Sequence, residues 1–141
     1  MQEFGIFVIN HWLLFIALVV VLVMLVMTTV QSRLLGYEEL KPLDLVQMIN
    51  RVEPLLLDVR NDDEFSGGHL ASARHIPLEQ LAERQEELQA YRDRPIVVYC
   101  RSGQRSARAA TLLKKKGFAR LYKLAGGMLA WQNSSLPVTR S

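Results

Sequence analysis

Cysteine is scarce in this sequence, with Cys100 the only example in 141 residues. A lone cysteine excludes an intramolecular disulfide framework and leaves too few thiolates for a structural zinc or iron–sulfur site. We therefore expect no metal, and redox chemistry in this chain would have to use a single thiol. The length suits one ordinary domain of about 100 to 150 residues.

Charged residues are absent from one long segment near the N-terminus, since residues 4–32 contain no Asp, Glu, Lys or Arg. A helix of roughly 20 apolar residues crosses a hydrocarbon core of about 30 Å. The apolar run is too long for a secretory signal, and its N-terminal flank has too few basic residues for one. A buried core helix is the other alternative, but a helix that is apolar on every side needs a large protein to bury it. We expect residues 1–32 to form a transmembrane anchor helix that contacts the lipid bilayer through residues 12–30.

Basic residues predict the orientation of this anchor. All 17 Lys and Arg lie after position 32, and Arg33 and Lys41 flank the span on its C-terminal side. The positive-inside rule then places the C-terminal domain in the cytoplasm, where a lone cysteine also stays reduced. Such a single-pass protein suits a bacterial inner membrane. The net charge is only +3, and because no basic patch is interleaved with aromatic residues we expect no nucleic-acid partner.

The rest of the chain is organised as one α/β domain. We expect a short tether at residues 33–41, the domain at residues 42–138 and a tail at residues 139–141. Apolar runs typical of buried strands alternate with amphipathic helical segments, which predicts a parallel sheet flanked by helices on both faces. The predicted strands cover residues 55–59, 95–99 and 120–124, and the predicted helices cover residues 43–50, 78–91 and 106–118.

Cys100 stands at the carboxyl end of a predicted strand and is followed by a polar loop and a helix. Ligands of open α/β sheets bind at this edge, and loop amides with a helix N-terminus form a cradle for anions. Arg101 and Arg105 add positive charge, so we expect an exposed Cys100 thiol with a lowered pKa. The alternatives are a buried, inert thiol and a solvated basic surface.

Further motifs lie on both sides of this loop. They are Leu57-Asp58-Val59-Arg60, Glu64-Phe65, Gly68-His69-Leu70, His75-Ile76-Pro77 and Leu124-Ala125-Gly126-Gly127-Met128-Leu129-Ala130-Trp131. Together with the loop they resemble, in order and spacing, the rhodanese family of single-domain sulfurtransferases. The resemblance covers the chain from about Pro42 to Val138 and implies a rhodanese-like domain. The apolar anchor lies outside the family pattern.

The resemblance implies a sulfurtransferase that needs neither metal nor cofactor. Cys100 would be the catalytic nucleophile, which takes a sulfane sulfur from thiosulfate or a persulfide, holds it as a persulfide and passes it to a thiol or to cyanide. Related phosphatases place an arginine at Cys-x5-Arg, whereas the Cys-x4-Arg spacing here implies a smaller pocket, suited to sulfur. The substrate-binding loop would consist of Arg101, Ser102, Gly103, Gln104, Arg105 and Ser106.

The remaining motif residues are expected to support the fold. We expect Asp58 and Arg60 to pair with one another or with loop backbone, and Gly126 and Gly127 to supply positive φ in a turn beneath the loop. Glu64 and His69 are expected to be fold-holding partners, His75 an exposed loop residue and Trp131 a core residue.

A second function also fits the sequence. The domain would then be a membrane-tethered, rhodanese-like interaction module without essential catalysis, and its partner would be a membrane protein.

Overall fold

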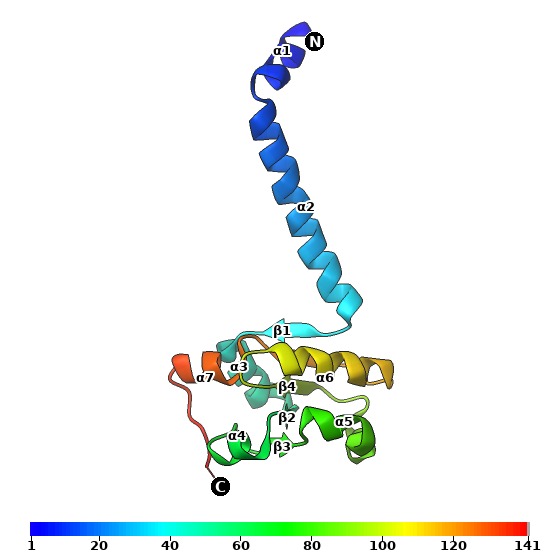
Figure 1. Cartoon of the computed structure of the whole chain (residues 1–141), viewed down its shortest axis with the longest axis vertical. Helices are drawn as coiled ribbons and strands as arrows, with labels where there is room; N and C mark the ends of the chain where they lie inside the picture. The colour runs from blue at the N-terminus through cyan, green and yellow to red at the C-terminus, as the bar shows by residue number, and fades with distance from the viewer. Residues whose placement is uncertain (141) are drawn as a thin grey trace. The chain divides into compact units, whose positions relative to one another are not determined.

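The computed structural model describes residues 1–140, with Ser32 and Arg33 by backbone alone, and the chain divides into two compact units. The first unit, Met1–Leu35, contains helix α1 (Gln2–Asn10) and helix α2 (Trp12–Leu35) (Figure 1). The second unit begins at Gly36 and contains every strand of the described chain.

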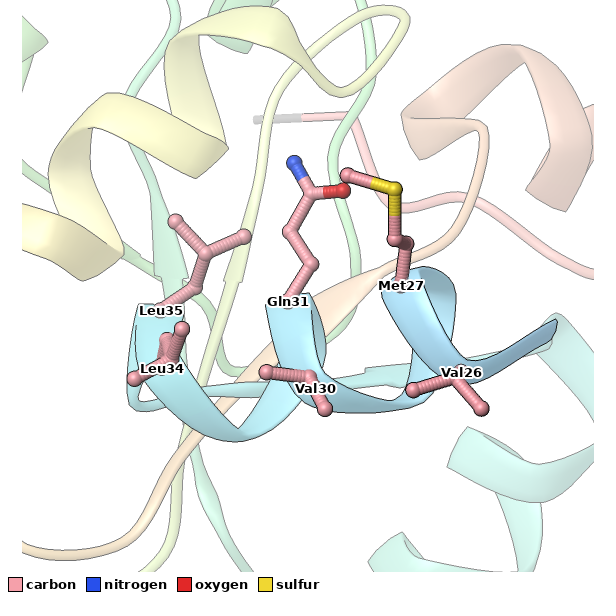
Figure 2. A pocket seen from close by; sticks show the side chains of 6 residues that line it. All are labelled: Val26, Met27, Val30, Gln31, Leu34 and Leu35. Carbon is pink, nitrogen blue, oxygen red and sulfur yellow. The ribbon is translucent and has the colours of Figure 1, made fainter. Parts of the chain in front are cut away.

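Helix α2 is long, apolar and exposed. Among the described residues it is the one helix long and apolar enough to cross a membrane, over Trp12–Gln31, with a mean hydropathy of 3.1 and no part of that stretch buried. Exposed apolar surface on this scale is normally covered by lipid or by another protein. Length and composition therefore make α2 a candidate membrane span. Figure 2 shows the six side chains of its last turns that line a pocket: Val26, Met27, Val30, Gln31, Leu34 and Leu35.

The second unit is built on a parallel sheet of five strands in the order β1-β5-β4-β2-β3. The strands are β1 (Glu38–Leu40), β2 (Leu55–Asp58), β3 (Arg74–His75), β4 (Ile96–Tyr99) and β5 (Leu121–Leu124). The helices are α3 (Pro42–Val52), α4 (Asp62–Ser66), α5 (Leu78–Arg84), the 3-10 helix η1 (Gln85–Tyr91), α6 (Gln104–Lys115) and α7 (Gly127–Asn133).

Alternate residues of the central strands feed two separate hydrophobic cores. Val98 of β4 faces the core that includes Leu81 of α5 and Leu113 of α6, whereas its neighbour Val97 faces the core that includes Leu45 of α3 and Trp131 of α7. Side chains alternate across a strand, so each face of the sheet carries its own helical layer. This confirms the predicted α/β fold, a parallel sheet flanked by helices on both faces, and the core position of Trp131.

The two edge strands were not predicted. Glu38–Leu40 pairs with Tyr122–Leu124, and Arg74–His75 pairs with Leu57–Asp58. The prediction of a tether over residues 33–41 is therefore wrong for its last part, because main-chain hydrogen bonds fix residues 38–40 at the sheet edge. Strands of two or three residues have too few side chains to show a periodic pattern.

The predicted single helix over residues 78–91 is also wrong. The chain forms α5 and then continues as the 3-10 helix η1. A 3-10 turn is narrower and rises further per residue than an α-helical turn. Both segments still use the predicted apolar face, since Leu81 and Leu88 are fully buried.

The predicted tail at residues 139–141 is partly ordered against the domain. The backbone of Thr139 exchanges two hydrogen bonds with His69, of 2.8 and 2.7 Å, in an antiparallel bridge. The tail therefore begins after Thr139 rather than before it, and its last residue, Ser141, lies outside the described residues.

Candidate active site

The loop between β4 and α6 wraps around the sulfur of Cys100. The backbone N–H of Gly103 donates to Sγ at 3.1 Å, and the backbone N–H of Ser106 donates at 3.4 Å. The hydroxyl oxygen of Ser106 lies 3.5 Å from the same sulfur. Gly103 adopts a φ of 115°, a left-handed conformation that costs a side-chain-bearing residue energy, and it caps the N-terminus of α6.

These donors control the ionisation of the thiol. Burial raises the pKa of Cys100, but the side-chain hydrogen bond of Ser106 and the backbone N–H groups of Ser106, Gly103 and Ser102 outweigh it, so the pKa is lowered. Hydrogen bonds to the charged form favour that form. The lowered pKa of Cys100 agrees with the expectation from the sequence, and the largest contributions that lower it come from hydrogen bonds of the loop.

The thiol is not exposed as predicted. Cys100 has 1% of its surface accessible, because the loop closes over the sulfur that its amides contact. Some side chains of the loop are buried with the sulfur and others are exposed to solvent. Ser106 is buried, while Arg101, Ser102 and Gln104 are exposed. Cys100 belongs to a hydrophobic core cluster, so the burial that the alternative interpretation expects is present. The N–H groups of Gly103 and Ser106 that donate to Sγ distinguish it from an inert thiol packed only against apolar groups.

A lysine contacts the loop and is itself paired with a glutamate, and neither residue was predicted to belong to the site. The carbonyl oxygen of Gly103 accepts hydrogen bonds from the Ser106 hydroxyl at 3.1 Å and from Nζ of Lys123 at 3.3 Å. The same ammonium group lies 2.9 Å from a carboxylate oxygen of Glu39. Lys123 is on β5 and Glu39 on β1, so the missing signal is the pairing of these two strands.

The two glycines before α7 allow a close approach to the loop backbone. Gly126 and Gly127 have φ values of 70° and 59°, the positive values expected from the sequence. A Cβ on Gly127 would lie 2.7 Å from the carbonyl carbon and oxygen of Arg101. Without that atom, the N–H of Met128 reaches the carbonyl oxygen of Cys100 at 2.8 Å.

Glu64 contacts the active loop directly, which the sequence analysis did not anticipate. Its two carboxylate oxygens accept hydrogen bonds from Arg105, 2.7 Å from Nη1 and 2.9 Å from Nη2. The N–H of Asn61 donates to the same carboxylate at 3.3 Å. Arg105 holds the pKa of Glu64 down at about 2 against the opposing effect of burial, with a smaller contribution from Asn61. Arg105 therefore presents a neutralised pair rather than a free cation.

Asp58 and Arg60 form a buried ion pair at the end of β2. Nη2 of Arg60 lies 2.7 Å from one carboxylate oxygen of Asp58 and also donates to the carbonyl oxygen of Gly68 at 2.7 Å. The two side chains are 0% and 6% exposed. Through Arg60, this ion pair joins the end of a central strand to the turn after α4, and α4 is the helix that carries Glu64.

The rings of His69 and His75 both stack with the ring of Phe65. Phe65 lies 3.9 Å from the ring of His69 and 4.4 Å from the ring of His75, centroid to centroid. The side chain of His75 is only 15% exposed, and one of its ring nitrogens is 2.7 Å from the carbonyl oxygen of Arg60, so the prediction of an exposed His75 is wrong. Residues 1–140 contain no group of three or more His, Cys, Asp or Glu placed to hold a metal ion.

A groove of about 280 Å³ opens between α4 and α7. Arg101 lines it from the active loop, and Leu129, 43% exposed, lines it from α7. The N–H of Leu129 donates to the carbonyl oxygen of Arg101 at 3.1 Å, so the groove adjoins the loop.

Fold and site together define a class of protein: an α/β domain with a cysteine at the carboxyl end of a central parallel strand, whose sulfur accepts hydrogen bonds from the backbone of the following loop. The model of the rhodanese-like domain matches residues 41–134, and the chain belongs to this family. The family identified from the sequence motifs is thereby confirmed.

Known proteins resemble the chain to different extents. It is 33% identical to the uncharacterized protein YibN of Escherichia coli over 99% of both chains. A sulfurtransferase of Allochromatium vinosum is 37% identical over 60% of this chain and 77% of its own length. YqhL of Bacillus subtilis, also uncharacterized, is 46% identical over 54% of this chain, and the match spans 59% of that protein.

A rhodanese-related protein of Thermoplasma volcanium has a similar solved structure. It is 30% identical, covers 74% of this chain and 100% of its own, and has a TM-score of 0.68. Family model, relatives and structure agree on a rhodanese-like fold, and they support sulfur transfer as the general activity of the family.

Proposed function

We propose that the protein is a membrane-anchored sulfurtransferase that carries sulfane sulfur as a persulfide on Cys100. The donor is thiosulfate or a persulfide, and the acceptor is a thiol or cyanide. The observation that carries the proposal is the set of hydrogen-bonding contacts at Sγ: the backbone N–H groups of Gly103 and Ser106 donate to the sulfur, and the Ser106 hydroxyl oxygen lies 3.5 Å from it. They lower the pKa of the thiol, which is what a nucleophilic cysteine needs.

The chemistry proceeds by double displacement. The Cys100 thiolate attacks the outer sulfur of the donor, and a new S–S bond forms. The bond that joined this sulfur to the donor breaks, and the rest of the donor leaves with the electron pair, as sulfite or as a thiolate. An acceptor thiolate then attacks the outer sulfur of the Cys100 persulfide and regenerates the thiolate. Neither half-reaction needs an oxidant or a reductant. The loop amides stabilise the anion in both states, as donors of an oxyanion hole do.

The loop supports sulfur transfer over phosphate chemistry. In the Cys-x4-Arg spacing the loop arginine is Arg105, whose guanidinium is held by the carboxylate of Glu64. A phosphatase needs such a guanidinium free to clamp the phosphate. Of the remaining loop side chains, Arg101, Ser102 and Gln104 are exposed and are proposed to contact the donor.

Intact mass spectrometry tests the sulfurtransferase directly. We expect the full chain in detergent to gain one sulfur atom after incubation with thiosulfate or cysteine persulfide, and to lose it when a thiol is added. Cys100→Ser should fold and gain nothing. An accessible thiol, shown by alkylation, that gains no sulfur from either donor would contradict the proposal.

A second experiment tests the alternative function, an interaction module without catalysis. Membrane proteins captured from membranes by the wild type and by Cys100→Ser are compared. A defined partner retained equally by both, together with no sulfur transfer, would favour the module.

The anchoring half of the proposal rests on α2. The span Trp12–Gln31 has the length and hydropathy of a membrane helix, and the basic residues after it predict a cytoplasmic domain. The full chain should stay in membranes under alkaline carbonate extraction, and a chain shortened to begin at Gly36 should not. Protease added to sealed inverted membrane vesicles should digest the domain if it faces the cytoplasm, and protection would reverse the proposed orientation.

A further inference from the structure

The charges around the candidate active site are almost all neutralised in pairs. Arg60 is bound to Asp58, Arg105 to Glu64 and Lys123 to Glu39. Of the cations that contact the loop or line the adjoining groove, only Arg101 has no ion-pair partner within the described part of the chain.

The pair between Arg105 and Glu64 matters most for a donor. Arg105 directly precedes Ser106, whose backbone N–H donates to Sγ of Cys100 at 3.4 Å, so Arg105 leaves the backbone beside the sulfur. The side chains are only 31% and 27% exposed, so solvent screens this pair less than a surface pair. A dianion approaching the thiolate of Cys100 therefore meets one free guanidinium rather than two.

The groove beside Arg101 carries its own pattern of charge. Asp63 of α4 lines it as well, is exposed, and has no ion-pair partner among the described residues. Leu129 and Gln132 of α7 add an apolar and an amide surface. A free cation and a free anion bordering one small groove are complementary to a group that carries both charges, such as the ammonium and carboxylate of an amino acid.

We propose that the sulfur donor is a small amino-acid persulfide, with its zwitterionic end in the groove between Arg101 and Asp63, and that the Glu64–Arg105 pair disfavours thiosulfate. This deepens the proposed sulfurtransferase function and rests on it. Thiosulfate brings two negative charges and no organic group to fill the groove. A groove of about 280 Å³ lies at the small end of ligand pockets, which suits an amino acid.

The transfer from such a donor balances without a further reactant. The thiolate of Cys100 attacks the terminal sulfur of R–S–SH and forms a new S–S bond. The S–S bond of the donor breaks, and R–S⁻ leaves with the electron pair. The products are the Cys100 persulfide and a free amino-acid thiol, which fits the same groove when it returns as acceptor.

The test compares kcat/KM for cysteine persulfide and thiosulfate on the full chain in detergent. We expect the wild type to favour cysteine persulfide by at least roughly tenfold. Glu64→Gln keeps a hydrogen-bond acceptor for Arg105 but removes the charge, so it should raise kcat/KM for thiosulfate about tenfold relative to that for cysteine persulfide. The ratio of the two donors is the readout, because a smaller folded fraction lowers both values equally.

Asp63→Asn tests the groove through an acid that forms no ion pair with Arg105, whereas Glu64 both lines the groove and pairs with Arg105. Asp63→Asn should lower kcat/KM for cysteine persulfide roughly fivefold without lowering that for thiosulfate. Asp62→Asn is its matched control, because Asp62 is the adjacent acid on α4 and does not line the groove. Glu87→Gln is the control for Glu64→Gln, since Glu87 pairs with Arg84 at an exposed site outside the loop. Both controls should leave the donor ratio unchanged.

The outcomes separate the two proposals. A wild type that favours thiosulfate, or a donor ratio that neither Glu64→Gln nor Asp63→Asn changes, overturns the donor assignment while sulfur transfer stands. A chain whose Cys100 accepts sulfur from neither donor overturns the sulfurtransferase itself.

Discussion

Gly127 lies directly against the carbonyl groups of Cys100 and Arg101, so the backbone that enters α7 supports the active loop from outside. A Cβ at this position would contact the carbonyl oxygen of Cys100 and lie 2.7 Å from the carbonyl carbon of Arg101. The support extends through the N–H groups of Met128 and Leu129, which donate to the same two carbonyls. A change at Gly127 should therefore reach the thiol without touching it.

Gly127→Ala should impair both stability and sulfur transfer. The φ of 59° alone costs an alanine about 1–2 kcal/mol, and the clash with the loop adds to this cost. We expect a lower melting temperature and slower sulfur loading of the remaining folded protein, measured by circular dichroism and mass spectrometry. Gly5→Ala is the control, because Gly5 has no positive φ and nothing lies within 4 Å of the Cβ that alanine would add. Equal behaviour of the two variants would contradict the proposed support.

Ser106→Ala should raise the pKa of Cys100. The Ser106 side chain makes the largest favourable contribution to the lowered pKa of the thiol, and alanine keeps the backbone N–H but removes the hydroxyl. The pH profile of iodoacetamide alkylation should move to higher pH, so that alkylation at neutral pH becomes slower. Ser102→Ala should leave the profile in place, because only the backbone of Ser102 contributes. A profile unchanged in Ser106→Ala would mean that the backbone amides alone control the thiol.

Asp58→Asn should destabilise the domain strongly. It leaves the guanidinium of Arg60 buried without its carboxylate, and breaking a buried ion pair costs about 3–5 kcal/mol. Chemical denaturation of the variant in the same detergent measures the loss. Arg84→Gln, which breaks an exposed pair with Glu87, should change the denaturation midpoint little. Similar losses in both variants would show that burial of the Asp58 pair has no special weight.

Glu64 should make the free energy of unfolding depend on pH in the acidic range. Its pKa falls from an ordinary value of 4.5 to about 2 on folding, so its contribution is fully present above pH 4.5 and is lost as the pH falls through about 2. The contribution at neutral pH is about 2 kcal/mol, the value of a hydrogen bond to a charged group. Glu64→Gln should be less stable than the wild type at pH 7, and the difference should shrink between pH 4.5 and 2. A difference independent of pH would contradict the assignment.

Local pattern was enough for much of the fold. The buried runs at residues 55–59, 95–99 and 120–124 contain β2, β4 and β5 within one residue at each end, because a fully buried parallel strand is apolar on both faces. The predicted helices at residues 43–50 and 106–118 overlap α3 and α6 for the same kind of reason, a continuous apolar stripe. The edge strands were not predicted, because two or three residues show no periodic pattern. The apolar face of residues 78–91 was predicted, but it did not distinguish the 3-10 helix from an α-helix.

The sequence by itself determined the family, because Cys100 and its polar loop are contiguous and each of the other motifs is a short segment that can be recognised locally. It also determined the apolar helix, which needs no partner to be recognised. Only the tertiary structure decided how the charges are used. Arg105 meets a carboxylate 41 positions away, and Lys123 reaches the loop through a strand pairing. Such contacts depend on which strands and helices become neighbours, and that is set by the packing of the whole sheet rather than by local spacing.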